Sequence, residues 1–209
     1  MMARQKRRSF GYRRNALSLL ELTLTMALLG LIVMGAYSFD LASRKFLRSS
    51  ERSIRVLNEL TFLVEHMQKN VLLGIGDAVS AGNEAIRVTT EPNGLLKVAI
   101  RQDAVDPATG TYTPWDYTDD HVALYVFNPS NDDLSDGGIA YPSHSITFDG
   151  ETIVRNLTEV SLSADAFGGG LALDVVVLRY DPHKAVHPRD NPQAIIVNQS
   201  FHSLSQSLS

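Results

Sequence analysis

The feature that most constrains this chain is a long apolar run near its N-terminus, from Ala16 to Tyr37. About 20 apolar residues, each rising about 1.5 Å in a helix, cross a hydrocarbon core of about 30 Å, so the run is long enough to span a bilayer. One carboxylate, Glu21, interrupts it. An ionised carboxylate in a bilayer costs roughly 2–4 kcal/mol unless it is paired, so Glu21 is a candidate functional residue whose partner has to be named.

The basic residues at the start of the chain are concentrated before this run. Residues 1–16 contain six basic residues and no acidic one: Arg4, Lys6, Arg7, Arg8, Arg13 and Arg14. The other 13 Lys and Arg residues stand against 23 Asp and Glu residues, which gives residues 17–209 a net charge of −10. We therefore expect a targeting segment rather than a nucleic-acid-binding surface. Basic residues beside an apolar span stay in the cytoplasm, which places the acidic remainder outside the inner membrane.

Three ways of processing the N-terminus compete for this pattern. Ala36-Tyr37-Ser38 is a small-x-small site at which a signal peptidase would remove the apolar run. Alternatively, the run stays as an uncleaved anchor, or a short basic leader is cut immediately before it. Only the last of these explains why a carboxylate lies inside the run.

The residues around Ala16 match a prepilin-type processing site. Residues 13–16 read RRNA and residues 17–26 read LSLLELTLTM, so a basic leader ends in a small residue and Glu stands at the fifth position of the apolar helix. In these residues the chain resembles the type IV pilin and type II secretion pseudopilin family. That family more often has Gly and Phe where this chain has Ala16 and Leu17, but the small and the apolar characters are kept.

The resemblance implies a particular maturation and assembly. A prepilin peptidase would cleave between Ala16 and Leu17, and the new amine of Leu17 would be methylated. Glu21, one helical turn away or on a neighbouring copy, would then neutralise this α-ammonium and give the subunit its axial register in a filament. The simpler interpretation is that Glu21 snorkels to the membrane interface.

The helix is expected to continue well beyond the bilayer. Residues 41–73 contain neither proline nor glycine, and Gly74-Ile75-Gly76-Asp77 is a C-terminal stop signal. We predict one helix from about residue 20 to about residue 73, on the order of 80 Å long. Apolar residues at helical spacing predict a one-sided stripe that packs on a sheet. They are Phe46, Leu47, Ile54, Leu57, Leu60, Leu63, Val64, Met67 and Val71.

After Gly76 the pattern changes to that of strands. Eight are predicted, at residues 85–90, 95–101, 122–128, 145–148, 152–155, 157–163, 171–180 and 194–204. Asp149-Gly150 is the sharpest turn signal, because this pair supplies the positive φ angles of a two-residue hairpin. The polar segments 103–120 and 129–138 are expected to be surface loops. The expected fold class is α+β, with a long N-terminal helix packed on an antiparallel sheet.

No catalytic or metal-binding pattern stands out. The chain has no cysteine, no G-x-S-x-G, no P-loop and no H-E-x-x-H, so we expect neither an enzyme nor a cofactor. Residues 131–137 have the acid density of a calcium loop, but Leu134 and Ser143 occupy ligand positions, which favours a solvated turn over calcium. His183 and His187 are four residues apart, yet Pro182 and Pro188 bracket them and disfavour the helix that would align them on a metal.

These features divide the chain into a basic leader (1–16), a membrane or filament-core helix (17–40), its amphipathic continuation (41–76) and a strand-rich domain (77–209). The resemblance implies a structural, minor subunit of a type II secretion pseudopilus or a type IV pilus, most similar in build to the J-type minor pseudopilin. Its partners would be prepilin peptidase, other pilin or pseudopilin subunits and an inner-membrane assembly platform. It would be a single-pass inner-membrane protein with a cytoplasmic N-terminus and a periplasmic domain, later extracted into the filament.

A different class of protein also fits the sequence. The chain would then be a single-pass, membrane-anchored periplasmic enzyme or sensor, unrelated to pili, in which Glu21 is incidental.

Overall fold

The structure is a computed structural model that describes residues 18–76, 83–106, 109–112, 116, 120–165 and 169–203. By their internal contacts, the residues form two compact units, Met1–Lys45 and Phe46–Ser209. The first contains the N-terminal part of a long helix. The second contains the rest of that helix and all the described strands.

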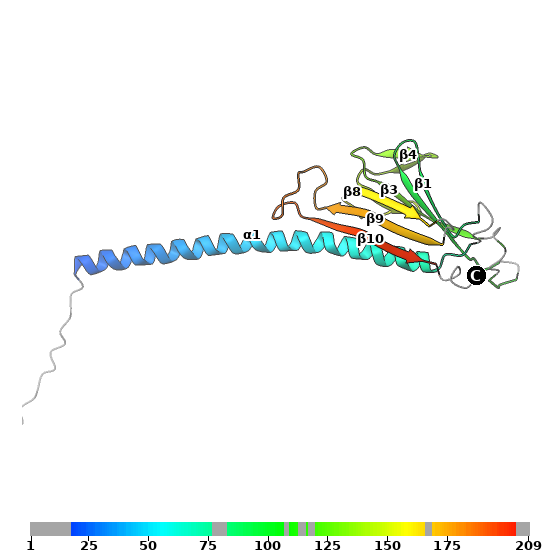
Figure 1. Ribbon diagram of the computed structural model, residues 1–209. Helices are drawn as coiled ribbons and strands as arrows, with labels where there is room; N and C mark the ends of the chain where they lie inside the picture. The colour runs from blue at the N-terminus through cyan, green and yellow to red at the C-terminus, as the bar shows by residue number, and fades with distance from the viewer. Residues whose placement is uncertain are drawn as a thin grey trace, which may run out of the picture. The chain divides into compact units, whose positions relative to one another are not determined.

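The helix, α1, runs from Leu19 to Leu72 without interruption (Figure 1). The absence of proline permits its 54 residues to keep an unbroken ladder of backbone hydrogen bonds. It ends where the Leu73 and Gly74 amides bond the carbonyls of Asn70 and Val71, at 3.2 and 3.0 Å. The prediction of a single helix from about residue 20 to about residue 73 is confirmed.

The larger sheet is antiparallel and has five strands in the order β1-β2-β3-β6-β7. Their bounds are β1 Ile86–Thr90, β2 Leu96–Gln102, β3 His121–Asn128, β6 Ser145–Phe148 and β7 Glu151–Arg155. In the turn between β6 and β7, Asp149 and Gly150 have φ values of 48° and 86°. Both are positive, as the Asp-Gly signal predicts for a two-residue hairpin.

A second antiparallel sheet has three strands in the order β10-β9-β8. Its strands are β8 Leu157–Ala164, β9 Gly170–Arg179 and β10 Gln193–His202. The central strand, β9, is the apolar segment at residues 171–180. All eight predicted strands are therefore present within a residue or two, and the α+β layout of a helix with antiparallel sheets is confirmed.

The sequence prediction missed one small hairpin. β4 (Leu134–Asp136) lies inside the segment 129–138 that was expected to be a polar loop, and it pairs with β5 (Ile139–Tyr141), which directly follows that segment. Gly137 and Gly138 make its turn with φ values of 56° and 84°. Strands of three residues with polar neighbours are too short to show an alternating pattern. These two strands are recognised only from their backbone pairing.

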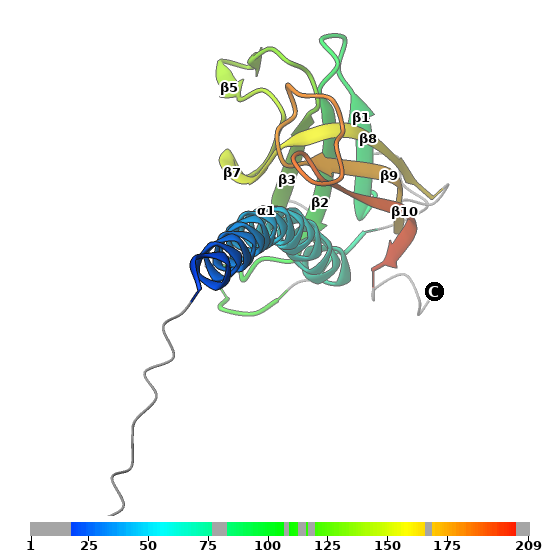
Figure 2. The same cartoon turned by 90° about the vertical axis from the view of Figure 1, so that its left-hand side faces the viewer.

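The C-terminal part of α1 and both sheets share one hydrophobic core. Val56, Leu60, Leu63, Met67 and Val71 are buried on the helix face that meets the sheets. Seen along α1, the strands lie to one side of the helix (Figure 2). This helix face packs on the inner faces of the sheets, and so the apolar residues of both are buried together.

The expected one-sided stripe is wrong in its first half. Leu60, Leu63, Met67 and Val71 are buried as predicted and Val64 is partly buried, whereas Phe46, Leu47, Ile54 and Leu57 are exposed. Three residues turn a helix by about 300°, so each step of three moves a side chain about 60° around the axis. Counted back from the buried Leu60, Leu57 and then Ile54 therefore turn away from the buried face. These exposed apolar side chains form a second apolar face of α1.

Candidate functional site

The first turn of α1 is closed by a reciprocal pair of hydrogen bonds between Ser18 and Glu21. The Glu21 amide donates to Ser18 Oγ at 3.2 Å, and the Ser18 amide donates to Glu21 Oε2 at 3.1 Å. This is a capping box, in which two N–H groups that lack partners at a helix N-terminus are satisfied by side chains. The Ser-x-x-Glu spacing is visible in the sequence, but the capping role of Glu21 was not predicted from it.

Glu21 has no ion-pair partner among the residues that the structure describes. The predicted cleavage site, Ala16 and Leu17, lies outside the described residues. The amide that Glu21 accepts from belongs to the residue that directly follows Leu17. A cut before Leu17 would therefore create a cationic amine on the residue next to Ser18, whose amide already bonds the Glu21 carboxylate. The helix dipole also stabilises the negative charge of Glu21 at this end of α1.

From Leu19 to Phe39, α1 presents apolar side chains on all its sides. Glu21 is the only Asp, Glu, Lys, Arg or His of this stretch, and the large apolar side chains of the stretch are exposed. The most apolar 18 residues have a mean hydropathy of 2.1, and none of them is buried. By length and composition this helix is able to cross a membrane.

The polar side chains of this stretch find partners inside the helix. The hydroxyls of Thr23, Thr25 and Ser38 donate to the carbonyls of Leu20, Leu22 and Met34, at 3.0, 2.9 and 2.9 Å. A hydroxyl bonded to its own helix carries little unsatisfied polarity, so these residues do not oppose insertion into hydrocarbon.

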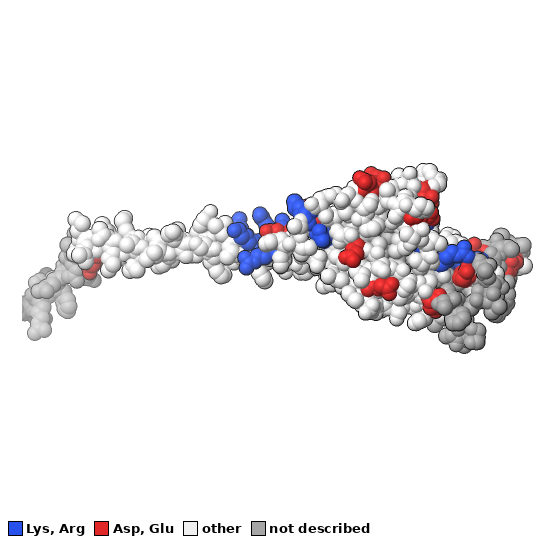
Figure 3. Space-filling model, turned by 45° about the horizontal axis from the view of Figure 1, so that its top comes forward, with Lys and Arg blue, Asp and Glu red and all other residues white. Residues whose placement is uncertain are grey.

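A belt of basic residues follows the apolar stretch on α1. It consists of Arg44, Lys45, Arg48, Arg52 and Arg55, and Figure 3 shows Lys and Arg gathered there. Arg44 pairs with Asp40 at 2.9 Å. A belt of charge directly after an apolar span is typical of the level at which a membrane-spanning helix leaves the bilayer.

The second apolar face of α1 lies beyond this point in the chain. Ile54 is 54% and Leu57 is 56% exposed, and Phe62, Leu72 and Leu73 are also exposed. They project away from the core side of the helix. Of these residues, Ile54, Leu57 and Leu72 lie within about 60° of one another around the helix axis. An uncovered strip of apolar side chains is a candidate interaction surface.

A polar network ties α1 to the larger sheet. The Asn70 side-chain amide donates to Tyr125 Oη at 2.7 Å, and Tyr125 Oη lies 2.7 Å from His66 Nδ1. Gln102 Nε2 donates to Asn70 Oδ1 at 3.0 Å. Burial and the nearby Lys69 ammonium lower the pKa of His66, and burial raises the pKa of Tyr125, so both rings favour their neutral forms. The network fixes the register of the helix on the sheet.

The acidic segment considered for calcium has protein partners instead. Asp133 Oδ1 accepts the Ser143 amide at 2.7 Å, and Asp136 forms an ion pair with Lys97, which also bonds Glu91 at 2.9 Å. These carboxylates raise the pKa of the Lys97 ammonium. Within the described ranges no three His, Cys, Asp or Glu side chains come together as metal ligands.

Comparison of the chain with protein-family models, with curated proteins and with solved structures finds no match.

Proposed function

We propose that this chain is a structural subunit of a filament of the type II secretion pseudopilus or type IV pilus class, assembled through α1 after removal of its leader. The observation that carries this proposal is the stretch Leu19–Phe39, an uncovered apolar helix with a single carboxylate in its first turn. A helix that is apolar on all sides requires lipid or other helices around it. A membrane covers it before assembly, and neighbouring subunits cover it in a filament.

The second apolar face of α1 supports a filament over a simple anchor. About 20 residues suffice to cross a bilayer, and the basic belt at residues 44–55 marks the exit of the helix into water. Ile54, Leu57 and Phe62 lie at or beyond that level and are still exposed. Lipid does not reach them, so another protein surface is their natural cover.

The remaining parts of the proposal follow from maturation as a prepilin. The peptidase cuts between Ala16 and Leu17 on the cytoplasmic side, Glu21 pairs with the α-ammonium of Leu17, and the β domain stays on the periplasmic side. The partners are prepilin peptidase, sibling subunits and an inner-membrane assembly platform. The subclass we propose is a minor subunit of the J type, with a structural rather than an enzymatic role.

One observation favours the second candidate, a membrane-anchored periplasmic enzyme or sensor. The capping box accounts for Glu21 without any filament, because a Glu three residues after a capping Ser stabilises any helix N-terminus. Both candidates need the capping bonds of Glu21, whereas only the filament subunit needs its negative charge.

Substitutions at Ala16 test the proposed maturation. When the chain is co-expressed with a prepilin peptidase, we expect the wild-type protein and the Ala16→Gly variant to lose residues 1–16. Ala16→Leu should keep its leader, because a bulky residue replaces the small one before the cut. Intact-mass measurement of membrane extracts distinguishes the forms. If all three proteins keep the leader, or if Ala16→Leu is cut as well as the wild type, maturation as a prepilin is refuted.

A further inference from the structure

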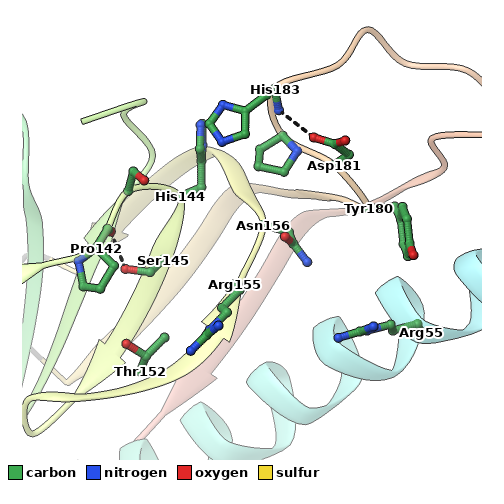
Figure 4. Close-up of a pocket in the computed structure, with 12 residues that line it drawn as sticks. Arg55, Pro142, His144, Ser145, Thr152, Arg155, Asn156, Tyr180, Asp181 and His183 are labelled. Carbon is green, nitrogen blue, oxygen red and sulfur yellow. Dashed lines mark hydrogen bonds between the residues drawn. The ribbon is translucent and has the colours of Figure 1, made fainter. Parts of the chain in front are cut away.

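The unit Phe46–Ser209 contains a hollow of about 560 Å³ that has no part in the proposed filament role (Figure 4). Its walls come from four parts of the chain. Arg55 comes from α1, residues 142–145 precede and begin β6, residues 152–156 belong to β7 and its end, and residues 180–183 follow β9. A hollow of this volume lies in the size range of small-molecule sites.

Two arginines and one aspartate line the hollow, in a chain that is acidic overall. The Arg155 side chain has no hydrogen-bond or ion-pair partner among the described residues. Arg55 Nε pairs with Glu59 Oε1 at 3.3 Å, and Glu59 Oε2 accepts a hydrogen bond from Asn156 Nδ2 at 3.4 Å. The one carboxylate of the lining, Asp181, is engaged by Lys184 Nζ at 2.7 Å and by the His183 amide at 3.2 Å. The lysine lowers the pKa of Asp181. An unpaired guanidinium that faces a hollow offers bidentate donors to an oxyanion.

Two lining residues hold unusual backbone conformations. His144 and Asn156 have φ values of 52° and 72°. His144 is buried, its Nδ1 lies 2.8 Å from the Leu157 carbonyl, and its Nε2 lies 2.7 Å from Asn131 Oδ1. Non-glycine residues in the left-handed region are over-represented at functional sites, where the surrounding structure holds them in place. Here both lie at the wall of the same hollow.

We propose that this hollow binds a sugar-sized organic anion, that is, a phosphate or carboxylate carried on a hydroxylated body. Arg155 takes the oxyanion, and Arg55 is the second guanidinium in the lining. The rest of the lining, which includes hydroxyls at Ser145 and Thr152 and the ring of Tyr180, suits hydroxyl groups and an apolar ring face. This site is independent of filament assembly.

The test uses the full chain in detergent, titrated calorimetrically at constant ionic strength. The probes are glucose 6-phosphate, glucuronate, inorganic phosphate and glucose. We expect at least one hexose anion to bind saturably and at least about tenfold more tightly than glucose and inorganic phosphate, because it alone uses both the charge and the volume of the hollow. The phosphate and carboxylate probes show which oxyanion is preferred. The absence of saturable binding by both hexose anions, or equal binding of inorganic phosphate, overturns the proposal.

A matched pair of arginine variants locates the binding. Arg155→Gln should weaken the binding of the hexose anion at least about tenfold. Arg48→Gln should leave it unchanged, since Arg48 is also an exposed arginine but does not line the hollow. The proposal fails if Arg155→Gln binds like the wild type while both variants keep the wild-type circular dichroism spectrum.

Discussion

Replacing Glu21 by Gln should lower filament assembly at least about tenfold while leaving the first turn of α1 intact. Gln is an alternative to Glu at the third position of a capping box, so the hydrogen bonds with Ser18 are kept and only the charge is lost. An unpaired charge in a membrane costs roughly 2–4 kcal/mol, so a subunit whose Leu17 ammonium has no partner should assemble at least about tenfold less well.

Ser18→Ala is the matched control for this variant. It removes the hydroxyl that caps the helix, which costs about 1 kcal/mol of helix stability, but keeps the Glu21 carboxylate. We expect it to assemble at close to the wild-type level. The measurement is the fraction of the chain in sheared filaments relative to the membrane fraction, with leader removal checked by mass. Normal assembly of Glu21→Gln together with loss in Ser18→Ala would assign Glu21 a capping role alone.

Mutations on the two apolar faces of α1 should have different effects on the stability of the subunit. Leu63 is 0% and Leu57 is 56% exposed, although they lie two turns apart on one helix. Leu63→Ala should lower the free energy of unfolding by about 2–5 kcal/mol, because it leaves a cavity between the helix and the sheets. Leu57→Ala should change it by no more than about 0.5 kcal/mol, since no packing in the subunit is lost.

In filament assembly the exposed residue should matter more: Leu57→Ala, which hardly changes stability, should impair assembly. Leu57→Ala, a stable subunit with a smaller exposed face, is expected to enter filaments severalfold less efficiently than the wild type. Denaturant unfolding of the full chain in detergent gives the first quantity, and filament recovery gives the second. Wild-type recovery for Leu57→Ala would show that the exposed face is not a subunit contact. A loss of stability equal to that of Leu63→Ala would show that it is not free in the subunit.

Much of this fold was predictable because its signals are local. The apolar run near the N-terminus and the stretch 41–73 without proline or glycine together predict α1, and the alternation of apolar residues predicts eight strands. The positive φ angles of Asp149 and Gly150 follow from their chemistry. The hairpin of β4 and β5 was missed because strands of three residues have no readable period.

What the sequence does not reveal depends on distant contacts. The second face of α1 becomes apparent only when the sheets cover the first, since both are apolar at helical spacing. Asn70, Tyr125 and Gln102 lie in separate elements, and no local pattern predicts their network. Arg55 and Arg155 are likewise about 100 residues apart and line one hollow only in the folded domain. The Ser18–Glu21 cap, by contrast, had a local signal in its Ser-x-x-Glu spacing.

The N-terminal residue of the protein extracted from its native membrane tests the proposed function most directly. If the proposal holds, mass spectrometry of the N-terminal peptide should identify N-methylated Leu17, the residue that a prepilin peptidase would expose and that we propose pairs with Glu21. An intact Met1, as in an uncleaved anchor, or a chain that begins at Phe39, as after a signal peptidase, would contradict the filament-subunit proposal.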